Sequence, residues 1–358
     1  MKLRLIEGGA GSGKSRLCLT EIAERLRENP MGAPLILLTP EQATFQAERR
    51  LVQFSGVGAS LSAQVMGFSV LYRWLAADER LPDLPWLDEQ GRAMLLASVV
   101  QQKLPELNLL KPAAKNASFV DQLARTLVEF EQCGVLPETL FETVKLLPAN
   151  DLLAAKLSEL TLIYQTYLQR IEGGFRDQGV MMRELAAMVE RSDKLSGAEL
   201  WLDGFMDLNP SQLSVLRGIM CKAKAVNVAL CLPDLGAARV FTGQRQLRSQ
   251  FVRLAAELGA EVEVTRLTAN YRQAGGGELA AVEVSFAAGQ FARVHADIPQ
   301  QVQLLAASDP REEAECAARL IVMLCRERGY KFRDIAVVTR VIAPYRRYLT
   351  AAFRDFGV

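Results

Sequence analysis

The sequence predicts an α/β protein: a parallel sheet covered by helices, with a large all-helical insertion, followed by the start of a second α/β domain. Three observations lead to this fold class. A glycine-rich loop follows a short apolar run at the N-terminus, similar runs recur before helical patterns, and residues 88–193 show helical periodicity with few strand signals. Short, near-continuous apolar strands are typical of parallel sheets that are buried on both faces.

The first strand is expected at residues 3–7, and the loop GGAGSGKS follows it at residues 8–15. This loop fits the pattern G-x-x-x-x-G-K-[S/T], whose glycines let main-chain N–H groups turn toward phosphate oxygens. Lys14 would reach the β- and γ-phosphates, Ser15 would ligate Mg²⁺, and a helix over 14–27 would direct its positive end at the anion. We therefore expect a P-loop NTPase core that binds ATP and Mg²⁺.

The nucleotide-binding residues are expected to be Gly8, Gly9, Ala10, Gly11, Ser12, Gly13, Lys14 and Ser15. The alternative is a glycine-rich turn without a ligand.

Repeated strand and helix signals define the expected domain organisation. Further strands are expected at 35–39, 63–66, 199–203, 226–231 and 261–266. Helices are expected at 89–100, 119–132, 153–170 and 181–190, separated by prolines. The expected domains are a discontinuous core (1–83 and 194–285), a helical insertion (84–193) and the beginning of a second domain (286–358).

The last domain is expected to contain strands at 302–305 and 334–340 and helices at 311–327 and 345–356, after a loop and a weakly amphipathic helix within 273–300. Because the chain ends just as this domain starts, we expect it to be part of a longer protein.

Composition excludes some classes of protein. The chain has 358 residues and a net charge of +1, so it lacks the overall basic charge of many nucleic-acid-binding proteins, although a local basic groove remains compatible. Its six cysteines show no metal-binding spacing, which predicts reduced thiols in a cytoplasmic protein. No signal peptide or membrane-spanning run is evident. His295 has no metal partner in the sequence and is expected at the surface.

A P-loop core also needs an acidic side chain at the end of another strand to hold Mg²⁺. Asp203 follows the apolar residues 200–202, at the expected end of a strand in the stretch ELWLDGFMDLNPSQ. We expect Asp203 to be the second Mg²⁺ ligand beside Ser15. An aspartate that only caps the next turn is the alternative.

The same stretch resembles superfamily 1 helicases of the UvrD/RecB type, in which the strand ends in an Asp-Glu pair. Gly204 stands in the place of that glutamate, whereas Phe205, Asp207, Asn209 and Gln212 match the pattern. The resemblance implies a RecA-like, helicase-like core. In those helicases the glutamate positions the attacking water, and losing such a base lowers the rate by ~10²–10⁴-fold. ATP binding with weak hydrolysis is therefore expected, and no catalytic residue is assigned.

Two stretches resemble the family's single-stranded DNA motifs, LLTPEQ at 37–42 and VMGFS at 65–69. The resemblance implies that Gln42 and Phe68 lie near DNA. Aromatic residues at helical spacing are nevertheless more often part of a hydrophobic core.

The stretch LTANYR at 267–272 matches the family's L-x-x-N-Y-R motif. The resemblance implies that Arg272 contacts the γ-phosphate and that Tyr271 stacks near the nucleotide base. The adenine-reading motif that normally precedes the glycine-rich loop is missing, and so is the glutamine motif after the fifth strand. Base selectivity is therefore not expected.

The combination of motifs is similar to the AddB (RexB-type) family, through the N-terminal loop, TPEQATFQAE at 39–48, DGF at 203–205 and GYKFRDIAVVTR at 329–340. The resemblance implies an AddA-type helicase–nuclease partner, single-stranded DNA and duplex DNA ends as ligands, and a role in resecting double-strand breaks while scanning for the Chi signal. It also implies an iron–sulfur cluster in a C-terminal nuclease domain that this chain lacks. Two alternatives remain: a self-sufficient P-loop NTPase or kinase, and a non-enzymatic DNA-scanning scaffold with a vestigial nucleotide site.

Overall fold

The computed structural model describes residues 1–56, 62–79, 81–82, 84–148, 151–172, 174–233, 239–272, 277–288 and 301–358. His295, whose surface position was predicted, lies outside these residues. Contacts divide the chain into two units, the first containing residues 1–276 and 282–292 and the second containing 277–281 and 293–358. In the described part of the chain, no helix has the length and apolar character needed to cross a membrane.

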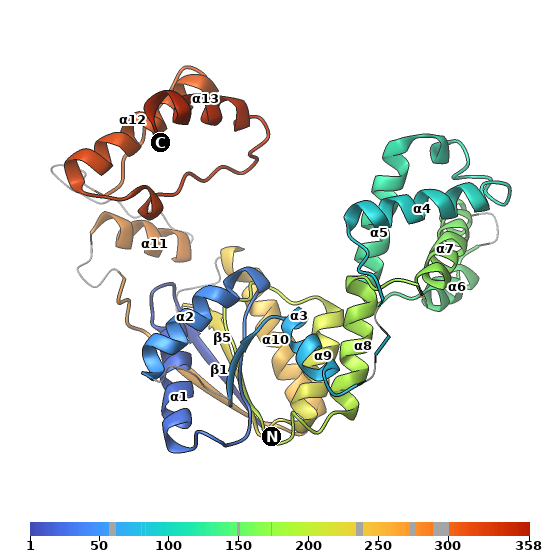
Figure 1. Ribbon diagram of the computed structural model, residues 1–358, viewed down its shortest axis with the longest axis horizontal. Coiled ribbons are helices and arrows are strands. Elements are labelled where there is room, and N and C mark those ends of the chain that lie inside the picture. The colour runs from blue at the N-terminus through green and yellow to red at the C-terminus, as the bar shows by residue number, and fades with distance from the viewer. Residues whose placement is uncertain are drawn as a thin grey trace. The chain divides into compact units, whose positions relative to one another are not determined.

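The first unit is built on a six-stranded sheet in which all neighbouring strands are parallel, in the order β3-β2-β4-β5-β1-β6 (Figure 1). The strands are β1 (Lys2–Gly8), β2 (Leu35–Leu38), β3 (Ala63–Met66), β4 (Glu199–Leu202), β5 (Ala225–Cys231) and β6 (Glu261–Leu267). The α/β class and the six strands predicted for this region are confirmed, each within two residues at either end.

The order of the strands places a topological switch point between β1 and β5. The chain leaves β1 toward β2 on one side, whereas it leaves the neighbouring strand β5 toward β6 on the other. The connections therefore diverge between β1 and β5. In open α/β sheets such a switch point, at the carboxyl ends of the strands, is where ligands bind.

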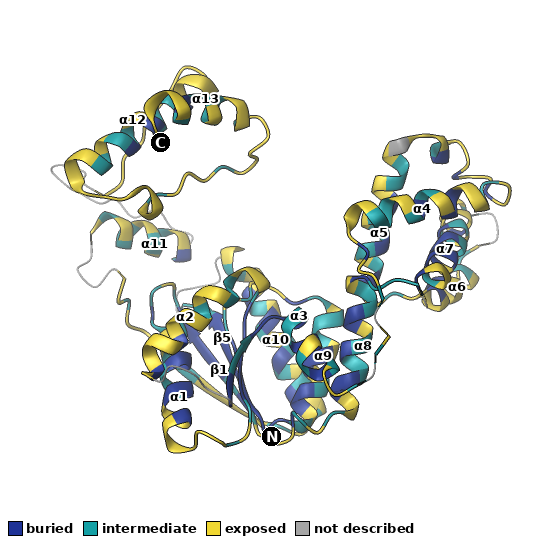
Figure 2. Ribbon diagram, in the orientation of Figure 1, coloured by how far each residue is buried: buried dark blue, intermediate teal, exposed yellow. Residues whose placement is uncertain are grey.

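Helices cover both faces of the sheet, because successive strand residues point to opposite sides. Ile6 packs with the helices on one face, and its neighbour Leu5 packs on the other. The first face is covered by α1 (Lys14–Glu28) and α2 (Thr44–Ser55). The opposite face is covered by α3 (Phe68–Ala76), α8 (Gln178–Arg191), α9 (Pro210–Lys222) and α10 (Thr242–Glu257). Figure 2 shows that strands such as β1 and β5 are largely buried between these layers, whereas the edge strand β6 is mostly exposed.

Between β3 and β4 the structure contains a group of helices with its own hydrophobic core, which includes Leu96, Leu127, Ile163 and Tyr164. The helices are α4 (Glu89–Lys103), α5 (Ala117–Gln132), α6 (Pro137–Lys145) and α7 (Leu152–Ile171). The helices predicted there are present. The hydroxyl of Ser211 on α9 donates to the main-chain oxygen of Glu131 on α5 at 2.6 Å, which links this group to the sheet.

The C-terminal part contains α11 (Glu278–Ala288), α12 (Pro310–Arg328) and α13 (Arg346–Phe356). The three helices predicted there are confirmed, but the strands predicted at 302–305 and 334–340 are wrong: residues 302–307 and 335–339 form no β-ladder. Apolar residues in these segments remain exposed, Leu304 at 98% and Val338 at 88%. A strand needs a hydrogen-bonded neighbour, and none of the described residues pairs with either segment.

Candidate functional site

The predicted phosphate-binding residues form one continuous loop at the switch point, between β1 and α1. Gly8 ends β1, Gly13 caps the helix, and Lys14 is its first helical residue. Gly11 and Gly13 have φ angles of +74° and +90°, a left-handed conformation that glycine adopts without strain. Left-handed residues in a short loop turn successive main-chain N–H groups toward one side, which creates a concave site for an anion.

The side chain of Lys14 is held by the loop itself. Its ammonium group donates to the main-chain oxygens of Gly9 at 2.6 Å and Gly8 at 2.9 Å. Burial is the main cause that lowers the pKa of this ammonium group; Cys231 and Asp203 act against that shift, and Arg272 adds to it. Lys14 therefore lies within the electrostatic reach of the predicted magnesium ligand and of the predicted phosphate-binding arginine.

The turn after β6 lies directly against the glycine-rich loop. The main-chain N–H of Tyr271 donates to the carbonyl oxygen of Gly11 at 2.9 Å. A Cβ atom at Gly11 would lie 2.7 Å from the Cβ of Arg272, and one at Gly13 would lie 3.1 Å from the ring of Tyr271. A larger residue at Gly11 would displace Arg272, and one at Gly13 would press on the ring of Tyr271. The structure thus brings Tyr271 and Arg272 to the loop.

Asp203 follows β4 at the same end of the sheet, and its main-chain N–H donates to the carbonyl oxygen of Leu38 on β2 at 3.0 Å. One strand, β5, separates β4 from β1. Two strand spacings correspond to about 10 Å, so the end of β4, which Asp203 follows, lies about this far from the end of β1, where the glycine-rich loop begins. The next residue, Gly204, has a φ of +85° and lies close to Pro40.

Glu283 on α11 was not anticipated from the sequence, although it lies beside the loop. Its carboxylate accepts from the side-chain amide of Asn270 at 2.9 Å. It also lies 3.9 Å from the position that a Cβ atom of Gly9 would take. No motif signals this role, because an isolated glutamate in an alanine-rich helix resembles a solvent-exposed residue.

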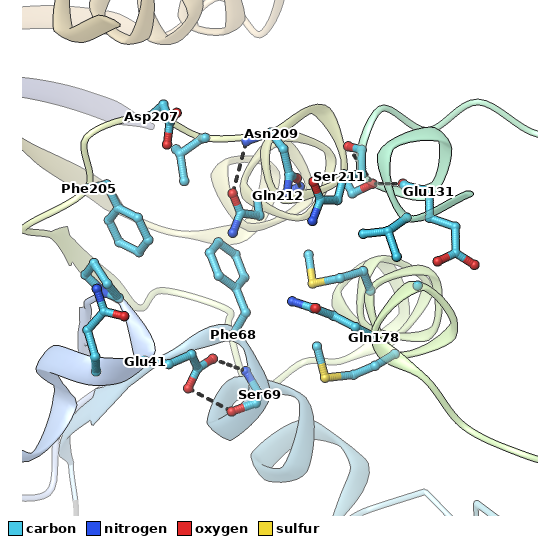
Figure 3. Close-up of a pocket in the computed structure, with 18 of the residues that line it drawn as sticks. Glu41, Phe68, Ser69, Glu131, Gln178, Phe205, Asp207, Asn209, Ser211 and Gln212 are labelled. Atoms are coloured by element: carbon cyan, nitrogen blue, oxygen red, sulfur yellow. Dashed lines mark hydrogen bonds between the residues drawn. The ribbon is translucent and has the colours of Figure 1, made fainter. Parts of the chain in front are cut away.

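The predicted DNA-binding residues line a separate cavity of about 840 Å³, which we call the groove. One wall comes from segments around the sheet (residues 39–42, 68–69 and 204–212), and the other comes from the helices (residues 128–132 and 178–182). Figure 3 shows Phe68, Gln178 and Gln212 pointing toward the middle of this cavity. The sequence motifs marked the first wall only.

Gln42 and Phe68 both line the groove but differ in solvent exposure. Gln42 is exposed, whereas Phe68 is only 6% exposed and contacts Phe205 edge-on, with 6.0 Å between the ring centroids. Phe68 therefore belongs to the hydrophobic core and also lines the groove. Glu41 accepts from the main-chain N–H and the hydroxyl of Ser69, both at 2.8 Å, and so fixes the start of α3.

The groove is not basic. Among the described residues, its lining contains the acidic side chains of Glu41, Glu131 and Asp207 and a single arginine, Arg92. Burial, together with the nearby carboxylate of Asp177, raises the pKa of Glu131 to about 7. The carboxylates of Glu41 and Asp207 disfavour phosphate groups inside the groove, whereas its aromatic, methionine and amide side chains suit uncharged, planar groups.

All six cysteines are free thiols. Among the described residues, no group of three or more His, Cys, Asp or Glu side chains is arranged to hold a metal ion.

Comparison with known proteins gives consistent matches along the chain. The family described as "ADDB, N-terminal" matches residues 5–283. A protein of Desulforudis audaxviator, named as one of the subunits of an ATP-dependent helicase/deoxyribonuclease, is 36% identical over 369 residues, which cover 100% of this chain and 31% of the relative. Proteins of the same name from Symbiobacterium thermophilum and Heliobacterium modesticaldum are 35% and 36% identical, covering 99% and 100% of this chain and 32% and 30% of those relatives. The chain thus spans about a third of the length of these curated relatives.

Proposed function

The chain belongs to the AddB N-terminal family, and on this basis we propose that it forms the N-terminal part of the AddB-type subunit of an ATP-dependent helicase/deoxyribonuclease. We further propose that residues 84–193 are a helical insertion in a helicase-like core made of residues 1–83 and 194–285. Residues 286–358 would then begin a second RecA-like domain. The exposed apolar segments at 302–305 and 334–340 would find their strand partners in the longer protein.

Within this subunit, the glycine-rich loop would bind ATP with Mg²⁺. The observation that supports this most is the meeting of residues 8–15 with Tyr271 and Arg272 at the switch point of the sheet, with Asp203 at the same end. The hydroxyl of Ser15 and the carboxylate of Asp203 are hard oxygen donors, which suit Mg²⁺. Arg272 would contact the γ-phosphate, and Tyr271 would lie near the base.

Hydrolysis of the bound ATP would be weak. The helicases that this chain resembles have a glutamate where this chain has Gly204, and the left-handed φ of +85° at this position disfavours any residue with a side chain. The local backbone is therefore adapted to the absence of that glutamate. This feature also favours the alternative of a scaffold with a vestigial nucleotide site.

Single-stranded DNA would pass along the groove, with bases rather than phosphates inside it. The acidic lining disfavours phosphates, whereas Phe68 and the side-chain amides of Gln42, Gln178 and Gln212 can contact base faces and edges. By family membership, the strand would be scanned for the Chi signal.

The biological setting follows from the same membership. The subunit would pair with an AddA-type helicase–nuclease, bind duplex DNA ends in the cytoplasm and take part in the resection of double-strand breaks for recombinational repair. The nuclease domain and its iron–sulfur cluster would belong to the part of the longer protein that this chain does not include.

Calorimetric titration of Mg-ATP into the chain and into Lys14→Ala tests the nucleotide site. We expect micromolar-range binding by the wild type and loss of binding by the variant, because the lysine charge is needed at the phosphates. Thermal unfolding of both proteins controls for folding, since Lys14 also holds Gly8 and Gly9. A folded wild type that binds no nucleotide would support the scaffold. Fast, DNA-independent turnover would support a self-sufficient NTPase.

A further inference from the structure

A hydrogen bond between Asn270 and Glu283 connects the glycine-rich loop to α11. The side-chain amide nitrogen of Asn270 donates to Glu283 Oε2 at 2.9 Å. Asn270 belongs to the turn that lies on the loop, and a Cβ atom at Gly11 would be only 2.7 Å from its Oδ1. The Asn270 side chain therefore lies between the glutamate and the loop.

The carboxylate of Glu283 determines which way the amide of Asn270 points. An ionised carboxylate only accepts hydrogen bonds, so the NH₂ group of Asn270 must face it and Oδ1 must face the opposite side. That oxygen accepts from the main-chain N–H of Arg272 at 3.1 Å. The orientation of Asn270 in turn holds the backbone of Arg272 beside Gly11.

We propose that Glu283 is a positioning residue of the nucleotide site, which acts through Asn270 to place Arg272 against the γ-phosphate. The proposal rests on the proposed function, because it requires nucleotide binding by the loop. Glu283 itself does not touch the phosphates. Its effect is therefore specific to the phosphate group that Arg272 contacts.

Comparison of Mg-ATP with Mg-ADP separates this role from a direct effect of charge. If Glu283 positions Arg272, Glu283→Ala should lower the affinity for ATP about 5-fold more than the affinity for ADP. This factor corresponds to the net contribution of one hydrogen bond. If Glu283 acted only through its negative charge beside the loop, its removal would instead strengthen ATP binding relative to ADP binding, because ATP carries more negative charge. The two explanations thus predict changes of opposite sign.

An exchange of donor and acceptor provides the second test. Asn270→Asp places a second carboxylate opposite that of Glu283. This variant is expected to weaken ATP binding at least as much as Glu283→Ala does. The double variant Asn270→Asp/Glu283→Gln restores a donor–acceptor pair and the original net charge, so it should recover ATP affinity to within about 2-fold of the wild type. Val282→Ala, on the same helix and partly exposed, serves as the matched control.

Calorimetry of both nucleotides and thermal unfolding of every variant complete the experiment. Equal weakening of ATP and ADP by Glu283→Ala, or no recovery in the double variant, would overturn the positioning role while the proposed function stands. A folded wild type that binds neither nucleotide would overturn both.

Discussion

Tyr271 donates its main-chain N–H to the carbonyl oxygen of Gly11 at 2.9 Å, so two segments separated by most of the sequence are joined at the switch point of the sheet. Around this bond Gly11 and Gly13 leave little room for a side chain, so the loop presents main-chain groups at these two positions. The contact connects the element predicted to bind phosphate with the element predicted to sense it.

Substitution of Gly11 by alanine tests how much this contact matters. Both Gly11→Ala and Gly259→Ala place a side chain at a left-handed φ, which costs roughly 1–2 kcal/mol, but only the first overlaps with Asn270 and Arg272. We expect Gly11→Ala to lower the free energy of unfolding by about 1–3 kcal/mol more than Gly259→Ala does, and to weaken Mg-ATP binding. Urea denaturation and calorimetry measure the two effects. Equal destabilisation by the two substitutions would contradict the close fit.

Restoring a glutamate at position 204 is not expected to restore hydrolysis. Gly204→Glu places a side chain at a φ of +85° near Pro40, which should destabilise the chain by roughly 1–2 kcal/mol and misplace the carboxylate. A phosphate-release assay with and without single-stranded DNA would show no gain in turnover. Gly329→Glu, at a φ of +73° with open space around it, controls for the backbone cost. A large gain in turnover would show that the missing glutamate alone limits hydrolysis.

The buried carboxyl group of Glu131 should make stability depend on pH. Its side chain is 4% exposed, and burial raises its pKa from 4.5 to about 7. The folded state therefore binds a proton more tightly than the unfolded state, so this group lowers stability as the pH rises from 4.5 to 7, by roughly 3 kcal/mol in total.

Glu131→Gln removes this titration. Relative to the wild type, the variant should gain stability progressively over that range and show no further gain above it. Urea denaturation at several pH values measures the difference, and Glu129→Gln, exposed on the same helix, is the control. A difference that does not change with pH would argue against the raised pKa.

The exposed side chain of Gln42 offers a conservative test of the groove. Gln42→Ala removes an amide that can bond to a base, so we expect affinity for a short thymidine oligonucleotide to fall about 5-fold. Gln46→Ala, on the neighbouring surface of α2 and outside the groove, should leave it unchanged. Fluorescence anisotropy gives both values. Equal affinity of the two variants for the oligonucleotide would show that the DNA does not pass along the groove beside Gln42.

Local patterns in the sequence were enough to predict the six strands of the sheet and the helix that follows the glycine-rich loop, but no bounds were predicted for α2, α3, α9 and α10. Strands such as β2 are short and apolar along their whole length because both faces are buried, and that pattern is visible without coordinates. The loop at residues 8–15 was equally visible, because glycine, lysine and serine are required there in a fixed order. The segments at 302–305 and 334–340 show the limit of such patterns: apolar alternation indicates a capacity to pair, but pairing needs a neighbour.

The sequence by itself determined where the glycine-rich loop lies and which residues we propose to bind phosphate, because that prediction depends on backbone freedom and on side chains close together in the chain. Only the tertiary structure decided what surrounds them. The strand order brought Tyr271 onto Gly11, and the helices supplied the second wall of the groove, including Gln178. Glu283 meets Asn270 only because α11 lies against the turn after β6. Such contacts join residues whose separation along the chain carries no local signal, and they are determined by how the whole chain packs.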